Sequence, residues 1–397
     1  MHATETVQAD SPVRLLKSSQ GWWCLGAGGG YARLKPHQVG PDGSINPGTE
    51  RHLREAGLYD QHDRRAYGLT VLTSTDCNLG CGYCFQNTAQ DPTGGTRPPR
   101  ITHSRLTSET IGSVLDFTAR RMAEAGQSRL SLLLFGGEPL LNPRGCAELL
   151  TRAADLGLVA ASMTSNGTLL SPALARQLAD AGLTSVQITF DGDRSEHDSI
   201  RVRRSGGGTF DTIVANMARS MDVTDLHWSL RVNVSHLNYL GMAELVDRLA
   251  ASLDTSRCSL YFELVGDVGL GYANELMRTG EFAALMTQWQ IRALEHGFTV
   301  RRPQAHTPCT FCSAENGRHG AVVNADGTLY SCWETAGKPG WEVGTVGDGY
   351  LPSAQTEGRW VACGDDYQYS ESKAALAEFR DTVDAALMDH LHATGRL

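Results

Sequence analysis

The stretch Leu69-Thr-Val-Leu-Thr-Ser-Thr-Asp-Cys-Asn-Leu-Gly-Cys-Gly-Tyr-Cys-Phe85 joins an apolar run to a cluster of three cysteines. The run Leu69–Thr73 has the composition of a buried β-strand, and Cys77, Cys81 and Cys84 follow it in a C-x3-C-x2-C pattern. Three thiolates this close in sequence can bind one face of a cubane iron–sulfur cluster and leave its fourth iron without a protein ligand. An open metal position is typical of a reactive site rather than a structural one.

Strand and helix patterns alternate from Tyr67 to about Val265. The predicted strands are short runs rich in leucine or β-branched residues: Leu69–Thr73, Leu130–Phe135, Val159–Thr164, Ser185–Phe190, Trp228–Val234 and Ser259–Val265. The predicted helices have apolar residues at three- and four-residue spacing: Ile111–Met122, Cys146–Ala154, Ala173–Ala181, Phe210–Met221 and Met242–Leu253. Repeated units of this kind predict an α/β fold with parallel strands, helices outside, and the chemistry at the carboxyl ends of the strands.

An aromatic residue, Tyr83, directly precedes the last cysteine of the cluster. With it, the motif resembles that of the radical S-adenosylmethionine (SAM) superfamily. The resemblance implies a partial (β/α)6 barrel and a 4Fe-4S cluster whose open iron binds SAM. It also implies reductive cleavage of SAM to a 5′-deoxyadenosyl radical that abstracts hydrogen from a substrate.

Further motifs follow the predicted strands and are similar to SAM-binding elements of that family. Gly136-Gly-Glu-Pro139 follows the second strand, and the resemblance gives Glu138 the role of binding the SAM amine. Ser165 and Asn166 end the third strand, near the expected ribose or carboxylate of SAM. A structural turn is the alternative at both places.

The fourth, fifth and sixth strands supply the remaining candidates at the barrel mouth. In Phe190-Asp-Gly-Asp-Arg-Ser-Glu-His-Asp-Ser-Ile-Arg201, Asp191 and Arg201 are candidate contacts to SAM or substrate. His197 is a candidate general base, and the alternative is that it clamps the loop. Weaker candidates lie on strands five and six: Arg231, Asn233 and Glu263.

A second group of cysteines lies near the C-terminus: Cys309, Cys312, Cys332 and Cys363. The C-x14-G-x4-C spacing that ends at Cys332 resembles the first half of the SPASM extension, whereas its second half, a C-x2-C-x5-C-x3-C run, is absent. The shortened form is similar to a twitch domain and implies one auxiliary 4Fe-4S cluster. A zinc site with the same thiolates is the alternative. Glu334 matches the place of an acidic base in related maturases, or else lies on a surface turn.

The N-terminal region precedes the strand–helix pattern. Trp22, Trp23, Leu25, Tyr31 and Leu34 surround a glycine-rich centre and predict a β-hairpin, followed by a helix from Thr49 that stops at Gly57. This element either packs on the barrel or receives a peptide. The expected organisation is residues 1–66 as this extension, 67–300 as the barrel and 301–397 as a small auxiliary-cluster domain with a C-terminal helix.

Composition limits the partners. The 397-residue chain carries a formal net charge of -9, which argues against nucleic acid as a partner. No apolar run is long enough to span a membrane, and no export signal accompanies the ten cysteines, so a reducing cytoplasm is expected.

The favoured function is a peptide maturase that installs a carbon–carbon or thioether cross-link in a ribosomally made precursor peptide. A flavodoxin- or ferredoxin-type reductant is its expected second partner. One alternative is a radical SAM dehydrogenase or epimerase that acts on an amino sugar, an amino acid or a peptide residue. The other is a non-catalytic zinc module.

Overall fold

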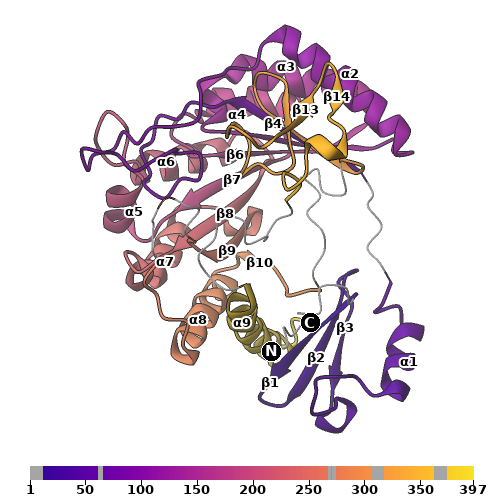
Figure 1. Cartoon of the computed structure of the whole chain (residues 1–397). Helices are drawn as coiled ribbons and strands as arrows, with labels where there is room; N and C mark the ends of the chain where they lie inside the picture. Colours follow the sequence, from indigo (N-terminus) through magenta and orange to yellow (C-terminus); the bar gives the residue numbers. More distant parts are fainter. Residues whose placement is uncertain (1–11, 61–65, 267–269, 271–273, 306–316, 362–372) are drawn as a thin grey trace.

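The computed structural model describes residues 12–60, 66–266, 270, 274–305, 317–361 and 373–397. Its centre is a curved 11-stranded sheet in the order β10-β9-β8-β7-β6-β5-β4-β11-β12-β13-β14 (Figure 1). Six consecutive parallel strands match the six that were predicted: β4 (Tyr67–Ser74), β5 (Leu130–Gly136), β6 (Leu158–Ser165), β7 (Ser185–Phe190), β8 (His227–Val234) and β9 (Cys258–Leu264). All eight residues of β4 are buried, as expected for a parallel strand that is covered on both faces.

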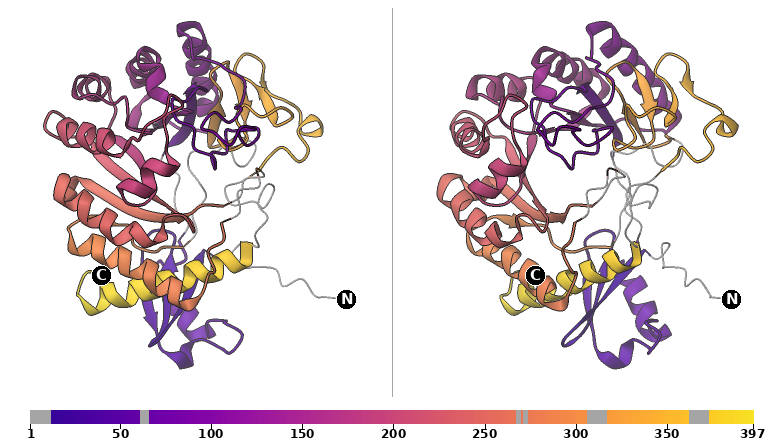
Figure 2. Two further views of the ribbon diagram at one scale, coloured as in Figure 1. Left: turned by 90° about the vertical axis from the view of Figure 1, so that its left-hand side faces the viewer. Right: turned by 60° about the vertical axis from the view of Figure 1, so that its left-hand side comes forward.

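Helices cover the outer side of the curved sheet (Figure 2). The five predicted helices are confirmed: α2 (Ser108–Glu124), α3 (Pro143–Ala153), α4 (Pro172–Asp180), α6 (Phe210–Met221) and α7 (Met242–Ser252). Three of them begin after a side chain that accepts a hydrogen bond from the first turn, namely Thr107, Asn142 and Ser171. A short helix, α5 (Arg194–Ile200), was not predicted.

The sheet continues past the predicted barrel into the C-terminal region. β11 (Gly320–Val323) pairs in parallel with β4, so that Val322 lies opposite Thr70. A turn at Asn324–Gly327 connects β11 to β12 (Thr328–Tyr330), and β13 (Glu342–Thr345) and β14 (Gly349–Tyr350) follow as antiparallel neighbours. At the other edge, β10 (Thr299–Val300) pairs with β9. The C-terminal strands therefore extend the barrel sheet.

The N-terminal region forms a separate three-stranded antiparallel sheet. The predicted hairpin is confirmed as β2 (Gly21–Gly26) and β3 (Tyr31–Leu34), and the predicted helix as α1 (Pro47–Glu55). An additional strand, β1 (Val13–Ser18), pairs with β2.

The C-terminal helix joins this sheet to the barrel. α9 (Lys373–Ala393) lies beside α8 (Gly280–Glu295) and crosses next to β1 (Figures 1 and 2). Arg14 on β1 donates from Nε to Asp381 at 2.9 Å, and Trp23 donates from Nε1 to Asp389 at 2.9 Å.

Short 3-10 helices complete the described chain: η1 (Pro36–Gln38), η2 (Pro139–Leu141), η3 (Ala154–Leu156), η4 (Tyr239–Gly241), η5 (Thr255–Arg257) and η6 (Ser353–Gln355). None of the helices in the described ranges is long and apolar enough to cross a membrane.

Candidate functional site

The loop of Cys77, Cys81 and Cys84 leaves the carboxyl end of β4 and is fixed by backbone contacts. The amide of Gly80 donates to the carbonyl oxygen of Val202 at 2.9 Å, and Leu79 forms an isolated bridge with Arg203. All three cysteines are free thiols; Cys81 is buried and the other two are half-buried. These contacts with the backbone at Val202 and Arg203 therefore hold the loop in one conformation.

Nitrogen donors surround the cysteine sulfurs. Cys77 Sγ accepts from the amide of Leu79 at 3.4 Å and from Asn166 Nδ2 at 3.8 Å, and Cys84 Sγ accepts from Arg100 Nη1 at 3.6 Å. Burial raises the pKa of Cys81 to about 12, so a bound metal must replace its proton before it ligates as a thiolate. The N–H donors stabilise negative charge on sulfur, and burial, which raises the pKa of Cys77 and Cys81, opposes it.

Two buried N–H donors near this loop indicate whether it suits an iron–sulfur cluster. Gln86 Nε2 and Arg100 Nε are buried and have no hydrogen-bond partner within the part of the chain that the structure describes. Buried donors normally have acceptors, and a cluster supplies sulfur atoms as acceptors. The three thiols and the two unpaired donors fit such a group. Among the described residues, no three His, Cys, Asp or Glu side chains converge on a position for a single metal ion.

Gly136 and Gly137 allow the chain after β5 to pass close to the loop before Cys77. Gly136 has φ +137°, and a Cβ at Gly137 would overlap the carbonyl oxygen of Asp76. In the structure, both glycines lie close to the backbone at Ser74 and Asp76. Pro139 begins η2 and is buried.

Glu138 connects the ends of β5 and β6. Its carboxylate is fully buried and accepts from Ser165 Oγ at 2.8 Å, from the Asn166 amide at 2.7 Å and from the Leu140 amide at 3.0 Å. Burial raises the pKa of Glu138, and these donors oppose that rise. Because a carboxylate offers about four acceptor positions, one position stays open for a further donor.

A second polar cluster links the cysteine loop to β7 and β8. The Tyr83 hydroxyl donates to Asp191 Oδ2 at 2.9 Å and accepts from Arg201 Nη1 at 2.8 Å and from Asn233 Nδ2 at 3.0 Å. Arg231 donates to Asn233 Oδ1 at 2.8 Å. Asp191 Oδ1 and Arg201 Nε are buried without a partner in the described ranges. The structure thus brings together five of the residues that the sequence selected: Tyr83, Asp191, Arg201, Arg231 and Asn233.

His197 is buried next to this cluster, beside Asp191. Its Nδ1 accepts from the Asp191 amide at 3.3 Å, its Nε2 lies 3.1 Å from Thr209 Oγ1, and its ring packs against Phe190 and Phe210. Burial lowers the pKa of His197 well below its usual value. Since both ring nitrogens are occupied and the side chain is fully buried, the geometry favours the clamp over the general base.

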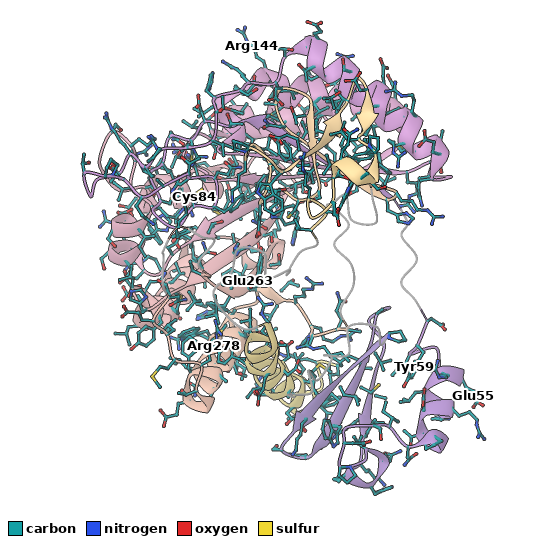
Figure 3. The ribbon with its side chains drawn as sticks, in the orientation of Figure 1. Glu55, Tyr59, Cys84, Arg144, Glu263 and Arg278 are labelled. Atoms are coloured by element: carbon teal, nitrogen blue, oxygen red, sulfur yellow. The ribbon has the colours of Figure 1, made fainter. Side chains whose placement is uncertain are left out.

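Glu263 and Glu334 occupy different surroundings. Glu263 on β9 accepts from Arg380 of α9 at 3.0 Å, and in Figure 3 its label lies at a height between those of Cys84 and Arg278. Glu334 is half-buried. Burial lowers the pKa of Lys338, while the charges of Glu334, Cys84 and Cys332 oppose that shift. These groups therefore lie in one neighbourhood.

Of the predicted auxiliary ligands, the structure describes only Cys332. Cys309, Cys312 and Cys363 lie outside the described residues. Cys332 is buried in a small apolar cluster with Val361, Trp333 and Trp341. Its neighbour Trp333 packs on Phe135 at 5.9 Å between ring centroids, and Phe135 stacks on Phe85 at 6.2 Å, so this segment adjoins the cysteine loop.

Sequence reasoning missed Gln86, Asn87 and Arg100. Asn87 Nδ2 donates to the carbonyl oxygen of Cys81 at 3.0 Å, and Arg100 Nη2 donates to Gln86 Oε1 at 2.7 Å. The available signal was the Pro98-Pro99 pair before Arg100, which favours extended chain suited to pairing with another strand.

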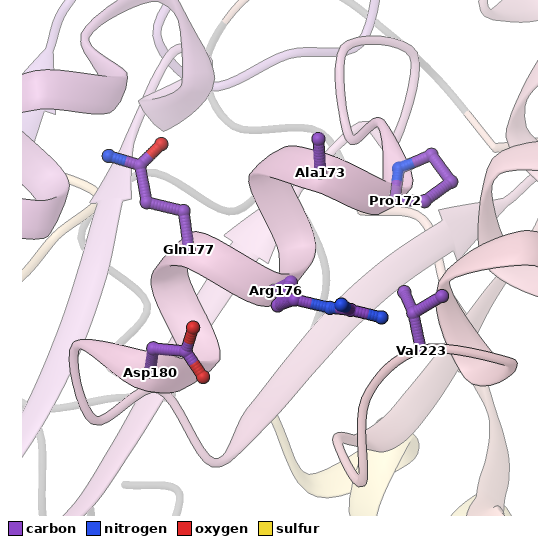
Figure 4. A pocket seen from close by; sticks show the side chains of 6 residues that line it. All are labelled: Pro172, Ala173, Arg176, Gln177, Asp180 and Val223. Carbon is purple, nitrogen blue, oxygen red and sulfur yellow. The ribbon is translucent and has the colours of Figure 1, made fainter.

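A separate hollow lies on the outside of the barrel, away from the strand ends. It has a volume of about 510 Å³ and is lined by Pro172, Ala173, Arg176, Gln177 and Asp180 of α4 together with Val223 (Figure 4). It contains none of the predicted site residues.

A family profile described as the Radical SAM superfamily matches residues 71–249, which include the cysteine loop and the strand ends described above. A GTP 3′,8-cyclase of Nostoc punctiforme is 32% identical over 256 residues, covering 60% of this chain and 70% of that protein. This chain belongs to the radical SAM superfamily. Membership implies a 4Fe-4S cluster and SAM as cofactors.

Other relatives match over a smaller share of their length. A GTP 3′,8-cyclase of Syntrophomonas wolfei is 25% identical over 235 residues, covering 58% of this chain and 66% of that protein. A probable GTP 3′,8-cyclase of Halobacterium salinarum is 29% identical over 194 residues, covering 49% of this chain and 50% of that protein.

Solved structures share the fold of this radical SAM protein at low sequence identity. The structure of anSMEcpe with bound AdoMet superposes with a TM-score of 0.60 and 16% identity, covering 83% of this chain and 100% of that chain. SuiB of Streptococcus suis bound to S-adenosylmethionine gives a TM-score of 0.51 and 13% identity, covering 88% of each chain. These likenesses establish the fold.

Proposed function

We propose that this protein is a radical SAM peptide maturase that uses reductive cleavage of SAM to start a cross-link in a ribosomally made precursor peptide. The observation that carries the SAM chemistry is the cysteine loop at the end of β4, with its three free thiols and surrounding donors. In the proposal, Cys77, Cys81 and Cys84 hold the cluster. When bound, the reduced cluster supplies the electron that breaks a carbon–sulfur bond of SAM.

The residues at the strand ends bind and orient SAM in this proposal. Glu138 has one acceptor position left after its three internal hydrogen bonds, which suits the ammonium group of SAM. Ser165 and Asn166 hold Glu138 in place and lie next to Cys77. The glycine pair and Pro139 set the path of this loop.

The cluster of Tyr83, Asp191, Arg201 and Asn233, with Arg231 beside it, forms the opposite side of the proposed SAM site. The unpaired Asp191 Oδ1 and Arg201 Nε offer an acceptor and a donor to a polar ligand. Holding the ligand between two fixed polar groups orients its reacting bond and restricts water.

Two observations support a peptide as the substrate. Within the described residues no strand pairs with the outer edge of β3, and an extended peptide can add to such an edge through main-chain hydrogen bonds. In addition, a fold neighbour, SuiB of Streptococcus suis, was solved bound to precursor peptide SuiA, with a TM-score of 0.50 and 12% identity. We assign peptide recognition to residues 1–66, the SAM chemistry to residues 67–300 and an auxiliary 4Fe-4S cluster to residues 301–397.

The auxiliary cluster would use Cys309, Cys312, Cys332 and Cys363, and Glu334 would act as the nearby base. A flavodoxin- or ferredoxin-type protein would supply the electron. The contact of Trp333 with Phe135 supports a position for this cluster close to the cysteine loop.

A small-molecule substrate is the second candidate, because the sequence relatives are named GTP 3′,8-cyclase. The test is to incubate the anaerobically reconstituted protein with SAM, a reductant and either GTP or a candidate precursor peptide. Mass spectrometry that shows loss of a pair of hydrogens from the peptide supports the maturase. A product formed from GTP alone would refute it.

A further inference from the structure

Arg100 lies against the cysteine loop and contacts both of its ends. Its Nη1 donates to Cys84 Sγ at 3.6 Å, and its Nη2 donates to Gln86 Oε1 at 2.7 Å and to the carbonyl oxygen of Thr75 at 3.3 Å. Thr75 precedes the first cysteine and Gln86 follows the last, so one guanidinium group spans the whole loop.

A short two-stranded pairing places Arg100 there. Asn87 and Arg100 form an isolated antiparallel bridge, the amide of Thr88 donates to Pro99 at 2.9 Å, and the amide of Ile101 donates to Gln86 at 3.1 Å. The chain thus leaves Cys84 and returns to lie beside it. Backbone hydrogen bonds fix the position of Arg100. Its side chain therefore loses little conformational entropy when it contacts the sulfur of Cys84.

The charge of Arg100 is not neutralised by a carboxylate. Its acceptors are a sulfur, two side-chain amide oxygens (Gln86 and Asn87) and a backbone carbonyl, and no acidic side chain within the described ranges forms an ion pair with it. Its Nε is buried and unpaired in the same part of the chain. A positive charge without a carboxylate partner in the described ranges therefore lies beside the Cys84 thiol and interacts electrostatically with Cys77 and Cys81.

We propose that Arg100 raises the reduction potential of the 4Fe-4S cluster through a charge-assisted N–H···S hydrogen bond to Cys84. Reduction adds one negative charge to the cluster, and a cation with an N–H donor stabilises the reduced form more than the oxidised form. Arg100 is thus a positioning and tuning residue that acts through a cluster ligand. This inference rests on the proposed binding of the cluster by Cys77, Cys81 and Cys84 and is independent of the substrate.

The test is an anaerobic redox titration followed by electron paramagnetic resonance, using the cluster signal that changes when SAM is added. The variants are Arg100→Gln, which removes the charge, and Arg100→Lys, which keeps the charge on a smaller donor. The control is Arg97→Gln on the same loop, because exposed Arg97 donates to the Arg204 carbonyl oxygen at 3.0 Å and forms no hydrogen bond with a cysteine of the described residues. Iron is quantified in every sample.

We expect Arg100→Gln to keep its iron and to show about a tenfold lower ratio of reduced to oxidised cluster at a fixed potential. For a one-electron couple, this equals a shift of the midpoint by about 59 mV to more negative values. Arg100→Lys should give an intermediate midpoint, and Arg97→Gln should match the wild type.

An unchanged or more positive midpoint in Arg100→Gln with full iron content would overturn the proposal. Loss of the cluster from both Arg100 variants would also overturn it, because Arg100 would then act only by holding the loop. A wild-type protein without any SAM-responsive signal would instead remove the cluster assignment on which the inference rests. Failure of the peptide assay would leave the titration unaffected.

Discussion

The loop of Cys77, Cys81 and Cys84 and the segment around Cys332 carry the same reactive side chain with different neighbours. Sulfurs of the loop accept from the amide of Leu79, from Asn166 and from Arg100. Cys332, by contrast, is buried in an apolar cluster with Val361 and two tryptophans.

The described residues therefore supply different interactions to the sulfur atoms at the two places. In the loop, donors that face sulfur favour negative charge there, as a ligated cluster requires. Around Cys332 the described residues supply apolar packing, with the charged groups of Glu334 and Lys338 in the same neighbourhood, and the other predicted ligands of the second cluster lie outside the described residues. The two regions touch through Phe85, Phe135 and Trp333, so their roles can be separated only by changing one at a time.

The largest effect is expected from Cys81→Ala. Loss of one of three proposed ligands leaves the cluster incompletely held, so formation of 5′-deoxyadenosine should fall to background. Liquid chromatography of reactions with SAM and dithionite measures this. The matched control is Cys258→Ala at the start of β9, which removes another buried thiol and should retain SAM cleavage. Equal loss of activity in both variants would contradict the assignment.

The Cys332→Ala variant should distinguish the roles of the two cysteine regions. We expect 5′-deoxyadenosine to form at a rate within severalfold of wild type, while the peptide product disappears, because the proposed auxiliary site acts after SAM cleavage. Both products are quantified in the same reaction by mass spectrometry. Cys146→Ala, which removes a buried thiol from α3, serves as control. Full peptide turnover by Cys332→Ala would exclude the auxiliary role.

Glu138→Gln should weaken SAM binding. A hydrogen bond to a charged group contributes about 1.5–3 kcal/mol, so the KM for SAM should rise about tenfold to a hundredfold. The folded protein should also lose stability, because Oε1 of Glu138 accepts from Ser165 and Leu140 and Oε2 accepts from Asn166, so an amide nitrogen at either position faces at least one donor. Comparison with Glu148→Gln on α3 controls for the loss of a charge. A wild-type KM in Glu138→Gln would show that this carboxylate only joins β5 to β6.

Among these variants, His197→Gln should have the smallest effect on SAM cleavage. It should change the pH dependence of the free energy of unfolding. Folding keeps His197 neutral, whereas the unfolded chain binds a proton below a pH of about 6.5. The unfolded state then holds more protons, so stability falls as pH decreases through that value, by up to about 1.4 kcal/mol per pH unit.

Denaturant unfolding between pH 5 and pH 8 measures this slope, which should be shallower in His197→Gln than in wild type. Retained 5′-deoxyadenosine formation would agree with a clamp between Phe190 and Phe210. Loss of the chemistry with unchanged stability would instead restore the general-base interpretation.

The sequence predicted the barrel well, because each strand and helix carries its own periodic signal. Leu130–Phe135 and Phe210–Met221 are examples whose bounds changed by at most a residue. The parallel pairing of β11 with β4 was missed, since no local pattern reveals which distant strand will be a neighbour.

Prediction of the site was similarly uneven. Two short motifs at the ends of neighbouring parallel strands contain the residues Cys77, Cys81, Cys84 and Glu138. Because such strand ends meet at one edge of the sheet, the predicted fold already placed these residues near one another. Arg100 reaches Cys84 only through a chain reversal whose local signal is a pair of prolines, and the burial of His197 depends on Phe210, a residue of the next helix.

The central claim is that two separate cysteine sets each hold a cluster. Iron and acid-labile sulfide are quantified in anaerobically reconstituted wild type and in a variant with Cys77, Cys81 and Cys84 all replaced by Ala. The account predicts about eight irons per chain in the wild type and about four in the variant, as two cubanes on separate ligands would give. Equal iron content in the two proteins would contradict it.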